Sequence, residues 1–137
     1  MKIIHIITSL GDGGAEHTLY KICKYDNSEH VVISLKGQGK YYTLLKKLGI
    51  KVYCLNMSFL SINKFFYLKN LLISLNPDVV QTWLVHADFF GGLAARFAGI
   101  KNIIWNIRYS KLEIGKAKLL TILITKLLSK LSFNIPK

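Results

Sequence analysis

Residues 2–25 of the chain read KIIHIITSLGDGGAEHTLYKICKY, an apolar run, a glycine-rich turn and then an amphipathic stretch. The run Lys2–Thr8 is short and rich in isoleucine, which is typical of a strand buried on both faces. In Gly14–Tyr25 the apolar residues recur at helical spacing, which predicts a helix with one packed face. A strand, a glycine turn and a helix in this order predict the first unit of a parallel α/β sheet.

The same alternation of strand and helix continues along the chain. Further apolar runs predict buried strands at His30–Leu35, Ile50–Leu55, Asp78–Trp83 and Asn102–Ile107. Helical spacing predicts helices at Tyr41–Leu48, Ile62–Leu75, His86–Ala98 and Lys116–Leu131. Parallel strands joined by helices require right-handed crossovers, so we expect a doubly wound, Rossmann-like α/β sheet.

The predicted helix ends agree with this pattern. Gly49 and Gly99 stand at helix C-caps, and Pro77 ends the helix before it. The small residues Gly91, Gly92, Ala94 and Ala95 predict that their helix lies close on the sheet. Residues 132–137 follow the last predicted helix, where another strand is due. We therefore expect residues 1–137 to form one Rossmann-like domain that is incomplete, with a second domain missing.

Composition limits the classes of function. Hydrophobic residues make up 51% of the 137 residues and charged residues 19%, which excludes intrinsic disorder. The net charge is +12, and 17 of the 19 cations are lysine. Because arginine is the preferred residue for base-edge contacts, this charge favours an anionic substrate or surface over nucleic acid.

The two cysteines and the hydropathy pattern indicate the expected compartment of the protein and its relation to metals and membranes. Cys23 and Cys54 lie far apart without metal-ligand spacing, so we expect free thiols in a reducing compartment, and neither a metal nor a cofactor. No signal peptide is evident, and no window reaches the ~18 apolar residues of a membrane span. We predict a cytoplasmic protein. The basic amphipathic stretches 62–75 and 116–131 either contact the inner face of a membrane or pack their apolar faces into the core.

The loop after the first strand is the first candidate binding element. Glycines permit a sharp turn and close approach to a ligand, and a helix start favours an anion such as a diphosphate. The candidate residues are Gly13, Gly14 and Glu16. The motif is neither G-x-G-x-x-G nor a P-loop, and residues 34–36 offer no acid for a ribose, which disfavours a nicotinamide cofactor. The alternative is a structural turn in which Glu16 only favours the helix start.

Two later loops carry further candidates. His86 and Asp88 begin the helix after the fourth predicted strand, where an imidazole can donate or accept a hydrogen bond. Their alternative roles are a helix cap and a first-turn acid. Arg108 follows the fifth predicted strand and is one of two arginines, suited to clamp a phosphate or carboxylate, or to pair with a neighbouring acid.

Taken in order, these segments resemble the amino-terminal domain of family 4 glycosyltransferases, retaining enzymes with two Rossmann-like domains in the GT-B fold. The resemblance spans essentially the whole chain and rests on Gly13–Glu16, Pro77–Trp83, His86–Asp88, Gly91–Arg96 and Trp105–Ser110. It implies transfer of a sugar from a UDP- or GDP-linked donor to a glycan or lipid-linked acceptor, in cell-surface polysaccharide synthesis.

The resemblance also implies roles for single residues. Gly13 and Gly14 would approach the donor diphosphate, and His86 would lie beside the reacting sugar as the catalytic residue. Glu16, Asp88 and Arg108 would bind substrate. The family's E-x7-E motif and its Arg/Lys pair belong to the second domain and are absent here. We therefore expect residues 1–137 to be inactive on their own. The alternatives are a non-catalytic binding module of the same fold and a nucleotide-binding Rossmann protein.

Overall fold

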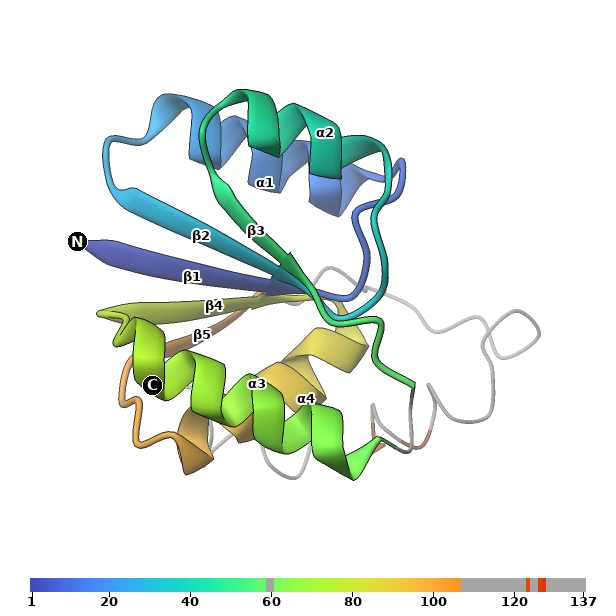
Figure 1. Ribbon diagram of the computed structural model, residues 1–137, viewed down its shortest axis with the longest axis vertical. Coiled ribbons are helices and arrows are strands. Elements are labelled where there is room, and N and C mark those ends of the chain that lie inside the picture. Colours follow the sequence, from blue (N-terminus) through green and yellow to red (C-terminus); the bar gives the residue numbers. More distant parts are fainter. Residues whose placement is uncertain (59–60, 107–122, 124–125, 128–137) are drawn as a thin grey trace.

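A computed structural model describes residues 1–58, 61–106, 123, 126 and 127 of the chain (Figure 1). Its elements in chain order are β1 (Lys2–Ile7), α1 (Gly14–Tyr25), β2 (Glu29–Ser34), α2 (Lys40–Lys47), β3 (Lys51–Cys54), α3 (Ile62–Leu75), β4 (Val79–Trp83), α4 (Val85–Phe97) and β5 (Ile103–Asn106). Each matches a predicted element, with small shifts at most ends. The predicted helix Lys116–Leu131 lies outside the described residues, apart from three isolated positions.

The strands form one parallel sheet in the order β3-β2-β1-β4-β5. The chain builds outward from β1 to β3, crosses back through α3, and continues from β4 to β5. Helices α1 and α2 cover one face of the sheet, and α3 and α4 cover the other (Figure 1). This arrangement confirms the predicted doubly wound, Rossmann-like α/β fold.

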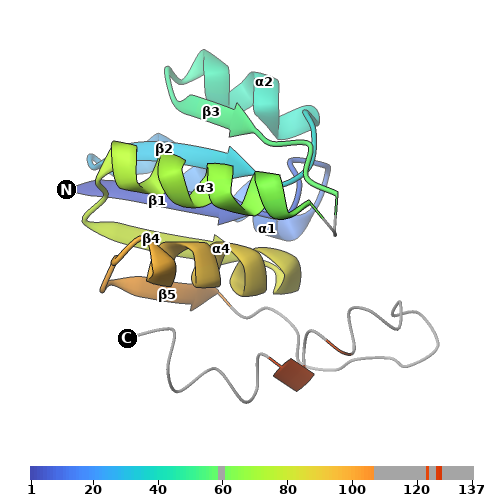
Figure 2. The same cartoon turned by 60° about the horizontal axis from the view of Figure 1, so that its bottom comes forward.

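Each face of the sheet has its own core because side chains alternate along every strand. Ile4 and Ile6 of β1 pack with Leu68 and Leu72 of α3 in one buried cluster. Ile7 belongs to the second cluster, together with residues of α1 and α2. Figure 2 shows α3 lying over β1 and β2, with α4 beside it over β4 and β5.

Helix α4 approaches β1 closely at a glycine. A Cβ atom added to Gly91 would lie 2.9 Å from Cγ2 of Ile6, closer than side chains normally pack. The prediction of a close helix–sheet contact is therefore confirmed at this position. In the described part of the chain, no helix is long and apolar enough to cross a membrane.

The loop after β1 is held in place by the start of α2. The backbone N–H of Tyr41 donates to the carbonyl of Leu10 at 3.1 Å. Lys40 Nζ lies 2.8 Å from the Asp12 carboxylate. A Cβ atom on Gly39 would overlap the Leu10 carbonyl. Glycine at position 39 is therefore required by a backbone contact that was not predicted from the sequence.

We expect Gly39→Ala to lower the free energy of unfolding by roughly 1–3 kcal/mol, since the added methyl forces two backbone segments apart. Gly14→Ala is the matched control, because nothing lies within 4 Å of a Cβ there. The control should be neutral or stabilising by a few tenths of a kcal/mol, as alanine favours helix. Urea unfolding monitored by circular dichroism measures both. Equal stabilities of the two variants would contradict the close contact.

Candidate functional site

The candidate site lies where the order of strands reverses, between β1 and β4. These strands pair in parallel, with Ile7 opposite Trp83, so their following loops leave the same edge of the sheet side by side. Helices α1 and α4 then run to opposite faces (Figure 1). Ligands of open α/β sheets bind in the crevice formed at such a reversal.

The first side of the crevice is the glycine loop and the start of α1. Gly13 is the N-cap and adopts an ordinary extended conformation without a side-chain cap. The Glu16 side chain is buried and accepts a 3.4 Å hydrogen bond from Ser9 Oγ. A Cβ on Gly13 would lie 2.5 Å from Glu16 Oε2, whereas Gly14 faces open space. Gly13 is therefore needed for the Glu16 carboxylate to fold back over it.

This position of Glu16 changes the electrostatics expected for the loop. A carboxylate already lies near the positive end of the α1 dipole, where a phosphate was expected to bind. A second anion beside it would be repelled unless Glu16 moved. The loop therefore differs from the phosphate-binding turn that was expected.

The second side is the turn from β4 into α4. Leu84, the N-cap of α4, has φ +74° and ψ 151°. This backbone region is almost restricted to glycine and costs a leucine on the order of 1–3 kcal/mol. The N–H of Asp88 closes the turn by donating to the Leu84 carbonyl at 2.9 Å. The strained turn places His86, partly exposed, in the first turn of α4. No glycine marks this turn in the sequence, so it was not predicted.

Asp88 occupies a different environment from His86. It is buried, and Thr82 Oγ1 lies 2.7 Å from its Oδ1. Burial raises the pKa of Asp88 to about 7. Thr82 Oγ1 also lies 3.4 Å from the Ile104 carbonyl. The Thr82 hydroxyl therefore has two acceptors in reach, and it donates to Asp88 Oδ1 in the shorter of the two contacts. Asp88 therefore joins α4 to the sheet and is not open to the crevice.

Two buried polar atoms near this edge have no hydrogen-bond partner among the described residues. They are Thr8 Oγ1, directly after β1, and Trp105 Nε1, in β5 opposite Thr82. Buried polar groups are usually paired, so each unpaired atom invites a functional explanation. A hydroxyl can donate or accept and an indole can only donate. Neither residue stood out in the sequence.

The structure thus places part of the predicted set at one edge of the sheet. Gly13, Gly14, Glu16 and His86 lie in the first turns that follow adjacent strands. Arg108 lies outside the described residues. Within the described residues, no three potential metal ligands gather at this edge.

Comparison with known proteins gives structural matches alone. No protein-family model matches the chain, and a search of curated proteins finds no match. Anabaena Alr3699/HepE, solved in complex with UDP, matches with a TM-score of 0.75 and 20% identity over 95% of this chain and 35% of its own. The lipopolysaccharide outer core galactosyltransferase WaaB matches with a TM-score of 0.57 and 19% identity, over 77% and 32% of the two chains.

A third match lies outside the transferases. The UDP-Glc/GlcNAc 4-epimerase from Campylobacter jejuni has a TM-score of 0.56 and 14% identity, over 97% of this chain and 50% of its own. The chain therefore spans about a third of the length of the glycosyltransferase structures it matches and half of the epimerase. At these identities the likeness establishes the fold: a Rossmann-like domain of the kind found in glycosyltransferases.

We expect the contribution of Asp88 to stability to fall as pH rises from about 4 to about 7. His5 opposes it over much of this range, because burial lowers the pKa of its imidazole to about 3 and its contribution rises with pH. In this window the folded carboxyl holds a proton that the unfolded one has released, so raising the pH favours unfolding. A pKa of about 7 against 3.8 corresponds to about 4 kcal/mol. Asp88→Asn should remove this loss, since an amide oxygen can still accept from Thr82. Urea unfolding at a series of pH values measures the effect.

The exposed Asp12 provides the matched control. Asp12→Asn should keep the pH profile of the unmodified protein between pH 4 and 7, whereas Asp88→Asn should gain stability relative to both as the pH rises. If Asp88→Asn and the unmodified protein gave parallel profiles across this range, Asp88 would not be the group responsible.

Proposed function

We propose that this chain forms the acceptor-side domain of a retaining family 4-type glycosyltransferase, which transfers a sugar from a UDP- or GDP-linked donor to a glycan or lipid-linked acceptor. The proposed setting is the cytoplasm, at the inner face of the membrane, in cell-surface polysaccharide synthesis. One observation carries the proposal: the Glu16 loop and the strained His86 turn follow neighbouring strands at the point where the sheet reverses.

The structural neighbours support a nucleotide-sugar reaction. HepE has been solved with UDP, with UDP-glucose, and with UDP and glucose. WaaB is a galactosyltransferase. Their likeness to this chain supports a sugar-handling role for the crevice, in agreement with the resemblance found in the sequence motifs.

The residues of the crevice have distinct proposed roles. The His86 imidazole orients and polarises a hydroxyl of the reacting sugar. Glu16 accepts hydrogen bonds from sugar hydroxyls, and Gly13 and Gly14 let the donor approach the backbone. Asp88 supports the turn that carries His86, because its carboxyl group is hydrogen-bonded to Thr82 of β4. Stabilisation of the leaving diphosphate is usually a large part of catalysis, and we assign it to Arg108 and to a second domain.

Helix α3 supports the proposed membrane contact. It buries Leu68 and Leu72 but leaves Phe66 and Tyr67 about half exposed. Lys69 Nζ lies 6.0 Å from the centre of the Phe66 ring. Aromatic residues mixed with lysine suit the interface of an anionic membrane.

The epimerase match keeps a nucleotide-binding Rossmann protein as the second candidate. The end of β2 argues against a nicotinamide cofactor. There Ser34 Oγ lies 3.1 and 3.3 Å from the carbonyls of Lys36 and Gly37, which share its single proton, and Leu35 is buried. In the described part of the chain, β2 therefore ends without the acid that would hold a ribose. NADH binding that UDP and GDP fail to compete would favour this candidate.

The first test is His86→Ala in the complete protein that carries this chain. Loss of the imidazole should lower kcat by roughly 10²-fold, with an unchanged melting temperature. Transfer of a radiolabelled sugar from UDP- and GDP-linked donors measures kcat. Lys24→Ala, at the other end of α1, is the control and should retain full activity. Full turnover by the His86 variant would remove this residue from the site, and no transfer by the unmodified protein would favour a binding module.

The second test compares adjacent glycines. Gly13→Ala should displace Glu16 and raise KM for substrate about tenfold, whereas Gly14→Ala, facing open space, should leave the Glu16 position unchanged. Melting temperatures should differ little, because the clash is with a side-chain end. If the Gly13 variant instead lost its fold and the activity per folded molecule stayed constant, Gly13 would be a turn element only.

A further inference from the structure

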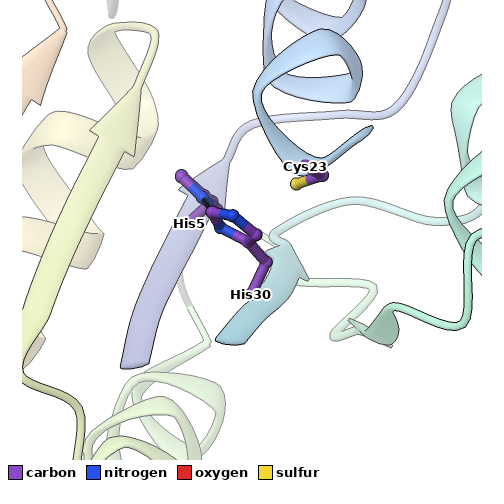
Figure 3. A group of neighbouring side chains, drawn as sticks. All are labelled: His5, Cys23 and His30. Atoms are coloured by element: carbon purple, nitrogen blue, oxygen red, sulfur yellow. Dashed lines mark hydrogen bonds between the residues drawn. The ribbon is translucent and has the colours of Figure 1, made fainter. Parts of the chain in front are cut away.

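A cluster of two histidines and a cysteine lies away from the crevice, between the sheet and α1 (Figure 3). His5 comes from β1, Cys23 from α1 and His30 from the start of β2, and all three side chains are buried. One potential ligand atom from each residue lies within 4.8 Å of the other two. His5 Nε2 and His30 Nδ1 are 3.0 Å apart.

The neighbours of the two imidazoles fix where their protons lie. The Trp83 indole can only donate, and its Nε1 lies 3.3 Å from His5 Nδ1. His5 therefore carries its proton on Nε2 and donates to His30 Nδ1. His30 then carries its proton on Nε2, which lies 3.0 Å from the Asp26 carboxylate, close enough for a charge contact but without hydrogen-bond geometry. A single proton thus joins the two rings, and His30 Nδ1 is the atom that accepts it.

We propose that this cluster is a binding site for Zn²⁺, with His5 Nε2, His30 Nδ1 and the Cys23 thiolate as ligands in place of the shared proton. On binding, the thiol proton leaves to solvent and the His5 imidazole proton moves from Nε2 to Nδ1. A water molecule takes the fourth position. The site is separate from the crevice and does not depend on the proposed glycosyltransferase function.

The donor set selects this class of metal. Two imidazole nitrogens and a sulfur suit Zn²⁺ and other thiophilic ions, whereas Mg²⁺ and Ca²⁺ require oxygen ligands. Zinc–ligand lengths of about 2.0–2.3 Å place tetrahedral ligand atoms about 3.3–3.7 Å apart. The two nitrogens must therefore separate by a few tenths of an ångström, and the sulfur must move inward by about 1 Å at most from the 4.8 Å limit.

Two further features fit a metal site. The Asp26 carboxylate lies 3.0 Å from the outer nitrogen of His30, where carboxylates commonly stand behind metal-binding histidines. A surface pocket of about 560 Å³, lined by His5, Asp26 and Lys21 among others, gives a path of entry and room for the water. The charged groups at this entrance are Lys21, the amino group of Met1 and the Asp26 carboxylate.

The Trp83 indole opposes metal binding, and this opposition gives a test that distinguishes a metal site from a structural histidine pair. Once the His5 proton lies on Nδ1, two N–H groups face each other across the 3.3 Å contact. The indole must then give up this hydrogen bond. Trp83→Phe removes the competing donor while keeping an aromatic ring in the core, so it should tighten Zn²⁺ binding. A structural histidine pair gives no such effect.

The test is titration of the chelator-treated protein with Zn²⁺ alone, against a chromophoric competitor. We expect one equivalent to bind, Cys23→Ala to weaken binding by at least about 100-fold, and Trp83→Phe to strengthen it about tenfold. Cys54→Ser and His17→Ala are the matched controls, each removing a thiol or imidazole outside the cluster, and should bind as the unmodified protein does. Cys23→Ala is a mild core substitution, so we expect this variant to fold, and circular dichroism verifies it.

Two results of this titration would overturn the proposal. Either no stoichiometric binding, or binding that survives Cys23→Ala and falls with Cys54→Ser or His17→Ala, assigns any zinc to exposed side chains. Nitrogen-15 spectra of the unmodified protein give a second measurement that needs no variant. A zinc-dependent change of His5 from the Nε2–H to the Nδ1–H tautomer supports the site, and unchanged spectra contradict it.

Discussion

The parallel pairing of β1 with β4 is the constraint on which the candidate site depends. Their register sets Ile7 beside Trp83, and the residues of the crevice lie on the two loops that begin after these positions. The pairing itself is secured by the crossover of α3, whose Leu68 and Leu72 pack on Ile4 and Ile6 of β1. Burial of four such side chains contributes several kcal/mol, more than any single polar contact at the edge.

That packing also sustains the strain at Leu84. A leucine in a glycine-only conformation would relax if the flanking segments were free to move. On one side Trp83 is fully buried, and on the other Ala87 is buried against the sheet. Gly91 allows α4 to press on Ile6 one turn further on. The rigid neighbours therefore fix the turn, and the turn fixes where His86 lies.

Elements with a local or periodic signal could be predicted from the sequence. The isoleucine-rich β1 and the helical spacing of α1 indicated both elements, and the order of elements indicated the sheet. Features that depend on contacts between distant segments could not be predicted in this way. Gly39 is needed because of the Leu10 carbonyl, which belongs to another loop. The histidine–cysteine cluster was missed because its ligands come from three elements and have no motif spacing, and the sequence had led us to predict no metal.

Trp83 lies beside both the crevice and the histidine–cysteine cluster. Its indole N–H reaches back to His5, while its backbone enters the strained turn before His86. A shared residue couples two sites only when it has two arrangements that each site favours differently. The His5 tautomer supplies that condition, because one form accepts the indole proton and the other rejects it. The indole is enclosed on all sides, so a change of tautomer cannot be absorbed by solvent and must be taken up in the packing around Trp83.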